Sequence, residues 1–131
     1  MNNKIAHLSF VVRDYAEAIR FFTEILEFKL LEDTRLSETK RWVIVGPENG
    51  NGCNLLLAKA VGEEQVSRIG NQTGGRVFLF LHTDDFDRLY NKLIKGGIRF
   101  VRPPSMEIYG KVAVFEDLYG NLWDLIEPIK A

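Results

Sequence analysis

The stretch HLSFVVRDYAEAIRFFTEILEFKLLED, residues 7–33, carries the pattern from which the fold is predicted. Residues 5–12 are mostly β-branched, aromatic and aliphatic, which is typical of a buried strand. Asp14 then stands where a helix N-cap is expected, and apolar residues recur after it at helical spacing: Ala18, Ile19, Phe22, Ile25 and Leu26. Residues 28–33 are predicted to form a second strand.

Two more strands are predicted at residues 41–46 and 53–60, on either side of the turn-rich segment PENGNG at 47–52. The chain up to residue 60 therefore has the order β-α-β-β-β.

The same order recurs in the second half of the chain. A strand is predicted at 76–83, followed by a helix that Asp84 or Asp85 caps and that Gly96 and Gly97 end. Its apolar residues are Phe86, Leu89, Tyr90, Leu93 and Ile94. Three strands follow at 98–102, 111–116 and 122–128, with the turn LYGN at 118–121 before the last.

The spacing of the two halves indicates an internal duplication. His7 precedes Asp14 by the same seven residues that separate Phe78 from Asp85. Further pairs keep an offset of 70 or 71 residues: Phe28 and Ile98, Arg41 and Lys111, Gly50 and Gly120, Asn54 and Asp124.

We therefore predict one α+β domain over residues 1–131, made of a first βαβββ module (4–60), a linker with one helical turn (61–75) and a second module (76–128). One module of about 60 residues is too small to be stable alone. Two curved sheets side by side leave a cleft between them, where a small ligand is expected.

Composition excludes several classes of partner. Seventeen basic residues face eighteen acidic ones, and no Lys/Arg cluster indicates binding to nucleic acid or to an anionic membrane. Cys53 is the only cysteine, so an intrachain disulfide and a cysteine-based zinc site are excluded. The sequence has neither a signal peptide nor a run of roughly 20 apolar residues, so we expect a cytoplasmic protein.

Three segments, residues 7–33, 83–104 and 114–128, resemble the vicinal oxygen chelate superfamily, which includes glyoxalase I, bleomycin-resistance and fosfomycin-resistance proteins and extradiol dioxygenases. The last segment, VFEDLYGNLWDLIEP, is similar to the family ending E-D-P-D-G-N-x-x-E-L, with Leu118 and Tyr119 in place of Pro-Asp. The resemblance spans about residues 4–128 and implies paired βαβββ modules, a ligand cleft and a homodimer.

The resemblance also implies four strand positions for metal ligands. They fall on His7, Asn54, Asp124 and Phe78, or on Val77 if Asp84 is the helix cap. Asn54 is a poor ligand for a transition metal and Phe78 is none, whereas zinc and non-haem iron sites use at least three protein ligands. His7 and Asp124 therefore form an incomplete metal set, and they are also a candidate acid–base pair.

His82 lies four residues past Phe78, roughly 13 Å along the strand, so we expect it to hold the nearby turn rather than to join His7. Glu127 is three residues past Asp124 and is expected on the opposite face of its strand.

Candidate ligand-binding residues are Asn54, Phe78, Arg41, Trp42 and Tyr109. Arg41 and Trp42 are neighbours on one strand, so only one of them faces the cleft. Arginine there binds an anionic group bidentately, whereas tryptophan stacks on an aromatic ring.

Two functions remain open from sequence. In the first, the cleft binds a small organic molecule without chemistry, as bleomycin-resistance proteins do. In the second, the protein is a metal-dependent lyase, isomerase or dioxygenase, in which His7, Asp124, water and a chelating substrate hold a weakly bound zinc, nickel, manganese or iron ion. We expect ordinary glyoxalase I activity to be absent, because two of the four metal-ligand positions hold Asn54 and Phe78.

Overall fold

The computed structural model describes residues 1–47 and 52–130, which form parts of two compact units, Met1–Ile69 and Gly70–Ala131. Each unit is described by itself. Most of the predicted turn at 47–52, and the predicted match of Gly50 with Gly120, lie outside the described residues. No helix among the described residues has the length and apolar character needed to cross a membrane.

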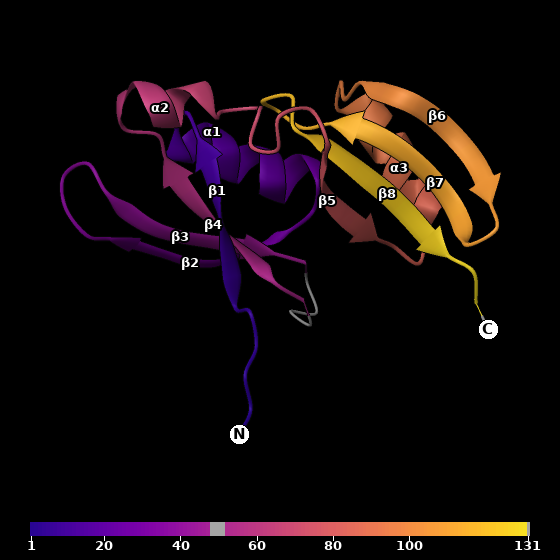
Figure 1. Cartoon of the computed structure of the whole chain (residues 1–131), viewed down its shortest axis with the longest axis horizontal. Coiled ribbons are helices and arrows are strands. Elements are labelled where there is room, and N and C mark those ends of the chain that lie inside the picture. Colours follow the sequence, from indigo (N-terminus) through magenta and orange to yellow (C-terminus); the bar gives the residue numbers. More distant parts are fainter. Residues whose placement is uncertain (48–51, 131) are drawn as a thin grey trace. The chain divides into compact units, whose positions relative to one another are not determined.

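The first unit holds one four-stranded sheet with the order β1-β4-β3-β2 (Figure 1). Its strands are β1 (His7–Val12), β2 (Lys29–Arg35), β3 (Arg41–Gly46) and β4 (Asn54–Lys59). Strand β1 runs parallel to β4, and the other two pairs are antiparallel. Between β1 and β2 the chain forms α1 (Tyr15–Arg20) and the π-helix η1 (Phe21–Ile25), and after β4 it forms the short helix α2 (Gly62–Ser67).

The second unit repeats this topology with the order β5-β8-β7-β6. Its strands are β5 (Val77–His82), β6 (Phe100–Glu107), β7 (Gly110–Glu116) and β8 (Leu122–Pro128), and its helix is α3 (Phe86–Lys95). Strand β5 runs parallel to β8, as β1 does to β4. The predicted α+β fold of two βαβββ modules is confirmed.

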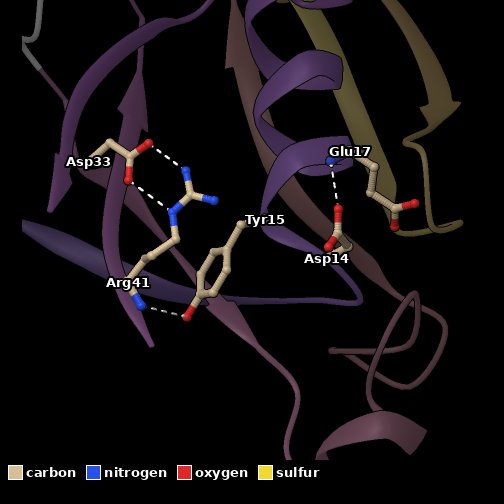
Figure 2. A network of polar contacts seen from close by, with 5 residues as sticks. All are labelled: Asp14, Tyr15, Glu17, Asp33 and Arg41. Atoms are coloured by element: carbon tan, nitrogen blue, oxygen red, sulfur yellow. Dashed lines mark hydrogen bonds and ion pairs between the residues drawn. The ribbon is translucent and has the colours of Figure 1, made fainter. Parts of the chain in front are cut away.

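Both long helices begin at an aspartate, as the sequence predicts. The Asp14 carboxylate accepts a hydrogen bond from the backbone N–H of Glu17 at 3.0 Å (Figure 2). Asp85, rather than Asp84, caps α3 by accepting from the Arg88 N–H at 3.3 Å. Each cap satisfies one N–H group that has no partner inside its helix.

The helix predicted after Asp14 is less regular than expected, because its second half is a π-helix. The chain leaves it through Glu27, whose φ of 63° lies in the left-handed region that favours glycine. In the second unit the corresponding residue is Gly97, with φ 84°. Both helical segments are thus followed by a residue in the left-handed region, but in the first unit this residue is a glutamate, which does not predict a helix end as glycine does.

Strand β6 extends five residues beyond its predicted end and contains Pro103 and Pro104. The pairing of β6 with β7 shifts between Phe100 and Arg102 and again between Arg102 and Ser105. These irregularities are possible because β6 is an edge strand, where a proline removes no required ladder hydrogen bond.

Alternation along the strands divides each sheet into two faces. In the first unit, Phe10 of β1 contacts Phe22 of η1 at 5.3 Å between ring centroids, and Val43 and Leu57 are fully buried beside it. In the second unit, Phe100 of β6 contacts Tyr90 of α3, at 4.6 Å. One face of each sheet is therefore packed by its helices, and the residues between these positions point to the other face.

The turn between β7 and β8 is built around a buried carboxylate, Asp117, which lies in the segment that resembles the family ending. One oxygen accepts from the backbone N–H groups of Tyr119, Gly120 and Asn121 at 2.9–3.1 Å. The other accepts from Trp123 Nε1 at 2.8 Å and from the Asn121 side chain at 3.1 Å. Burial raises the pKa of Asp117, and these hydrogen bonds lower it in part.

Replacing Asp117 with asparagine is expected to lower the free energy of unfolding by about 2–3 kcal/mol, because an amide NH₂ then meets donors that the carboxylate satisfied. Urea denaturation followed by circular dichroism measures the loss. Asp84→Asn is the matched control, since Asp84 is exposed, and a change within about 0.5 kcal/mol is expected there. Equal effects of the two substitutions would contradict the role of Asp117.

Candidate functional site

His7 and Asn54 lie directly opposite each other at the start of the parallel β1–β4 pair. Leu55 and Leu57 of β4 are buried, whereas Asn54, Leu56 and Ala58 alternate with them. His7 and Asn54 therefore belong to the face of the first sheet that points away from α1, called here the face opposite α1. His7 is exposed there.

Trp42 lies on the same face. Ile44 pairs with Leu56 in the β3–β4 ladder, so Trp42, two residues before Ile44, shares their side of the sheet. The indole of Trp42 meets the imidazole of His7 edge-on, with ring centroids 6.2 Å apart and an interplanar angle of 81°. Of the two neighbours that the sequence left undecided, Trp42 thus accompanies His7.

Arg41 points to the α1 side, where it is held by two contacts (Figure 2). Its guanidinium donates two hydrogen bonds to the Asp33 carboxylate, at 3.0 and 2.5 Å, and lies over the Tyr15 ring at 5.1 Å from the centroid. The hydrogen bond with Asp33 raises the pKa of Arg41. The Arg41 backbone N–H also donates to the Tyr15 hydroxyl at 3.2 Å. Arg41 is therefore committed to structure within its own unit.

A pocket of about 440 Å³ opens beside Trp42, at the end of β3 and β4 next to α2; we call it the Trp42 pocket. Its apolar lining comes from aromatic and aliphatic side chains of β3, β4, α1 and the start of α2. They are Tyr15, Trp42, Leu56, Leu57, Ala58, Ala60 and Val61.

The polar lining of the Trp42 pocket is mostly donor in character. Gln65 of α2 has its side-chain oxygen occupied, because that oxygen accepts the Val61 N–H at 2.9 Å. The other polar residues of the lining are Thr39, Lys40, Arg41 and Lys59. Aspartate and glutamate are absent from the described lining.

Asn54 is less available than the sequence suggests. Its side-chain oxygen is buried and has no hydrogen-bond partner among the described residues. The amide packs on Gly46, where an added Cβ atom would lie only 2.1 Å from that oxygen. The side-chain oxygen of Asn54 therefore packs against the backbone of Gly46, and this packing requires a residue without a Cβ atom at position 46.

In the second unit, Asp124 of β8 lies opposite Phe80 of β5 on one side and Val114 of β7 on the other. Burial raises the pKa of the Asp124 carboxyl, and the positive charges of Arg102 and His82 lower it in part. Phe80 is 63% exposed. A half-buried carboxylate thus stands between two apolar neighbours, with Arg102 and His82 near enough to act on it.

The structure gives two details of this strand pair that the sequence leaves open. Asp124 lies opposite Phe80 and not Phe78, because a register shift between Val77 and Leu79 interrupts the β5–β8 ladder. His82 is therefore only two residues beyond the partner of Asp124, close enough to influence its pKa. The side-chain hydrogen bond in the turn after β5 comes from Thr83, which accepts the Asp85 N–H at 3.1 Å, and the described hydrogen bonds include none from the His82 ring.

Glu127 and Tyr109 complete the residues singled out from sequence. Glu127 lies on the α3 side of β8, as predicted, and accepts the backbone N–H of Phe86 at 2.8 Å. Tyr109 stands at the tip of the β6–β7 hairpin with its side chain exposed, and its carbonyl accepts the Ile129 N–H at 3.1 Å. The role of Tyr109 in ligand binding stays a prediction.

A sequence profile of the Glyoxalase/Bleomycin resistance protein/Dioxygenase superfamily matches residues 4–125. The chain belongs to this superfamily. The resemblance noted from sequence is therefore confirmed over nearly the whole chain. A relative from Shewanella frigidimarina, described only as an uncharacterized protein, is 59% identical over 97% of this chain and 95% of its own.

Two solved structures share the fold. UcmS2 has a TM-score of 0.81 at 28% identity, over 97% of this chain and 99% of that one. TnmS3, an antibiotic-binding protein from Streptomyces sp. CB03234, has a TM-score of 0.76 at 27% identity, over 98% of both chains.

The residues at the superfamily's metal-ligand positions do not fit a transition metal. Within the described ranges, 1–47 and 52–130, no group of three or more His, Cys, Asp or Glu side chains is arranged to hold a metal ion. In the first unit His7 is accompanied by an indole and an amide, and in the second Asp124 faces Phe80. Catalytic zinc and non-haem iron need three protein donors, and each unit offers one at these positions.

Sequence reasoning missed Phe80 and Arg102 near Asp124, and Leu56, Ala58, Val61 and Gln65 in the Trp42 pocket. The alternation of β4 gives the side of Leu56 and Ala58 once Asn54 is placed. The register shift in β5 and the position of α2 carry no comparable sequence signal.

Replacing Arg102 with glutamine is expected to raise the pKa of Asp124, because a positive charge that favours its carboxylate form is removed. An NMR titration of the side-chain carboxyl carbons measures the change, with Asp124→Asn to assign the resonance. Arg99→Gln is the matched control, since Arg99 pairs with Glu116 and should leave Asp124 unchanged. An unchanged Asp124 titration in Arg102→Gln would show that the two side chains do not interact.

Proposed function

We propose that this protein binds a small organic molecule with an aromatic ring system, using the face opposite α1 and the Trp42 pocket, without a complete metal site. One observation carries the proposal: Trp42 lines the pocket and also contacts His7, the histidine at a functional position of the superfamily. A ligand that packs on the Trp42 indole in the pocket would therefore lie close to His7.

The size and lining of the pocket support this function. A volume of about 440 Å³ falls within the range of small-molecule sites, which are mostly apolar with a few placed polar groups. An indole face favours an aromatic ligand, since stacked or edge-on ring pairs contribute about 0.5–1.5 kcal/mol beyond their buried area. The proposal is also supported by the neighbour TnmS3, which is described as an antibiotic-binding protein.

The surroundings of His7 favour binding over chemistry. An acid–base histidine is usually oriented by a hydrogen-bonded partner. Among the described residues, the His7 ring instead contacts the Trp42 indole edge-on. Three further points stay predictions: the pair His7 and Asp124, the single domain built from residues 4–60 and 76–128, and a homodimer.

A ligand found by thermal-shift screening of planar aromatic compounds is expected to quench tryptophan fluorescence through Trp42. The chain has two tryptophans, and the second, Trp123, is buried on Asp117. Trp42→Phe leaves Trp123 as the only reporter, so the quenching should disappear. Trp42→Ala should weaken binding about tenfold or more, as calorimetry can measure.

Ile94→Ala is the control for a general effect of removing an exposed apolar side chain, since Ile94 is exposed on α3 of the second unit. Binding that persists unchanged in Trp42→Ala would overturn the proposed site. The same titrations on His7→Ala and Asp124→Asn, singly and together, test the predicted pair, because residues that act on one ligand give non-additive losses.

Zinc, nickel, manganese or ferrous ions are expected to leave the midpoint of thermal unfolding unchanged. A specific ion at a hundred times its Kd would stabilise the folded chain by about 2.7 kcal/mol, which is readily detected. Any shift should be compared in His7→Ala and in His82→Ala. A stabilisation that is lost only in His7→Ala would favour the metal-dependent lyase, isomerase or dioxygenase instead.

A further inference from the structure

We infer that the ligand of the Trp42 pocket is an aromatic anion, whose rings lie on the apolar floor and whose negative group points toward Lys40 and Lys59. This inference rests on the proposed binding function and names the ligand class. It follows from the charges, the hydrogen-bonding capacity and the strand geometry of the pocket lining.

The charges of the pocket lining are of one sign. Lys40, Arg41 and Lys59 line it, and no carboxylate does so in the described part of the chain. Arg41 is already neutralised, because its guanidinium donates two hydrogen bonds to Asp33, which lies outside the lining. The two lysines are exposed, and the ion pairs of the described residues include neither of them. Their positive charges are therefore available to a ligand.

The hydrogen-bonding groups of the pocket favour a ligand that accepts. The Gln65 side-chain oxygen is occupied by the Val61 N–H, and the Tyr15 hydroxyl oxygen accepts the Arg41 N–H. One lone pair of the Gln65 oxygen is thereby used, and the NH₂ group of the same side chain can only donate. Together with two ammonium groups, this lining matches a carboxylate, sulfonate or phenolate better than a cation.

Lys40 is the better placed of the two lysines. It precedes Trp42 by two residues, and both residues line the pocket. The Lys40 backbone is fixed by the β2–β3 loop, since its N–H donates to Ser37 Oγ at 3.1 Å and its carbonyl accepts the Leu36 N–H at 2.9 Å.

Lys59 has competing neighbours. It also borders a second hollow of about 430 Å³, whose lining includes Asp14 and Glu38. Lys59 is therefore shared between two hollows, whereas Lys40 lines only the Trp42 pocket of the two. We expect Lys40 to contribute more than Lys59 to binding an anion in the Trp42 pocket.

The test uses two dyes with the same rings. 1-Anilinonaphthalene-8-sulfonate carries a negative group, and N-phenyl-1-naphthylamine is its neutral analogue. Fluorescence titration of the full chain should show tighter binding of the sulfonate, and its affinity alone should fall as salt is raised. Lys40→Gln should weaken the sulfonate about two- to fivefold, and Lys59→Gln by less, with the neutral dye changed under about twofold.

Lys95→Gln is the charge-matched control, because Lys95 lies at the end of α3 in the second unit, and it should alter neither dye. Thermal unfolding of each variant checks that the fold is intact.

Three outcomes distinguish the anionic ligand class from the proposed binding function on which it rests. Sulfonate binding that depends on Trp42 and on Lys40 supports both. Equal binding of the two dyes that depends on Trp42 but not on the lysines overturns the anionic ligand and leaves the proposed function standing. Binding of neither dye, or binding unchanged in Trp42→Ala, overturns both.

Discussion

Helix α1 covers one face of the β1–β4 sheet, and alternation along the strands then sends every second residue to the other face. Phe10, Val43 and Leu57 are drawn into the core by this packing. His7, Trp42 and Asn54 are displayed on the other side as a consequence. A shift of one residue in the register of any of these strands would move its core residues to the exposed face and its site residues into the core. The register that buries the core therefore also fixes which side chains form the candidate site.

The second unit follows the same constraint with different chemistry. Its topology is the same, yet Asp124 takes the position equivalent to Asn54, and Phe80 rather than a histidine lies opposite it. The segment that resembles the family ending also stabilises the fold, because the Asp117 carboxylate accepts hydrogen bonds from backbone N–H groups of the β7–β8 turn and from the Trp123 indole. One motif thus contains both a turn-forming carboxylate and, seven residues later, a carboxylate on the sheet face.

The polar residues of the Trp42 pocket show how structure limits what a side chain can do for a ligand. Arg41 is charged and close to the pocket, but Asp33 and Tyr15 already engage it. The Gln65 oxygen already accepts the Val61 N–H, whereas its NH₂ group can donate to a ligand. Fewer residues can therefore act on a ligand than the lining suggests, and the inferred preference for an anionic ligand rests on those that can.

The sequence by itself determined the order of the elements, the duplication, the capping role of Asp14 and the superfamily, because these depend on local spacing and on residue types that only a few backbone geometries accept. The π-helix after Arg20 and the helix end at Glu27 could not be predicted, since neither has the glycine or proline that signals such geometry.

Only the tertiary structure decided that Trp42 and not Arg41 accompanies His7, that Phe80 faces Asp124, and that α2 completes a pocket beside Trp42. The physical reason is common to the three. Each depends on pairing between segments distant in the chain, where a register shift or a competing partner such as Asp33 changes the outcome without changing the local pattern.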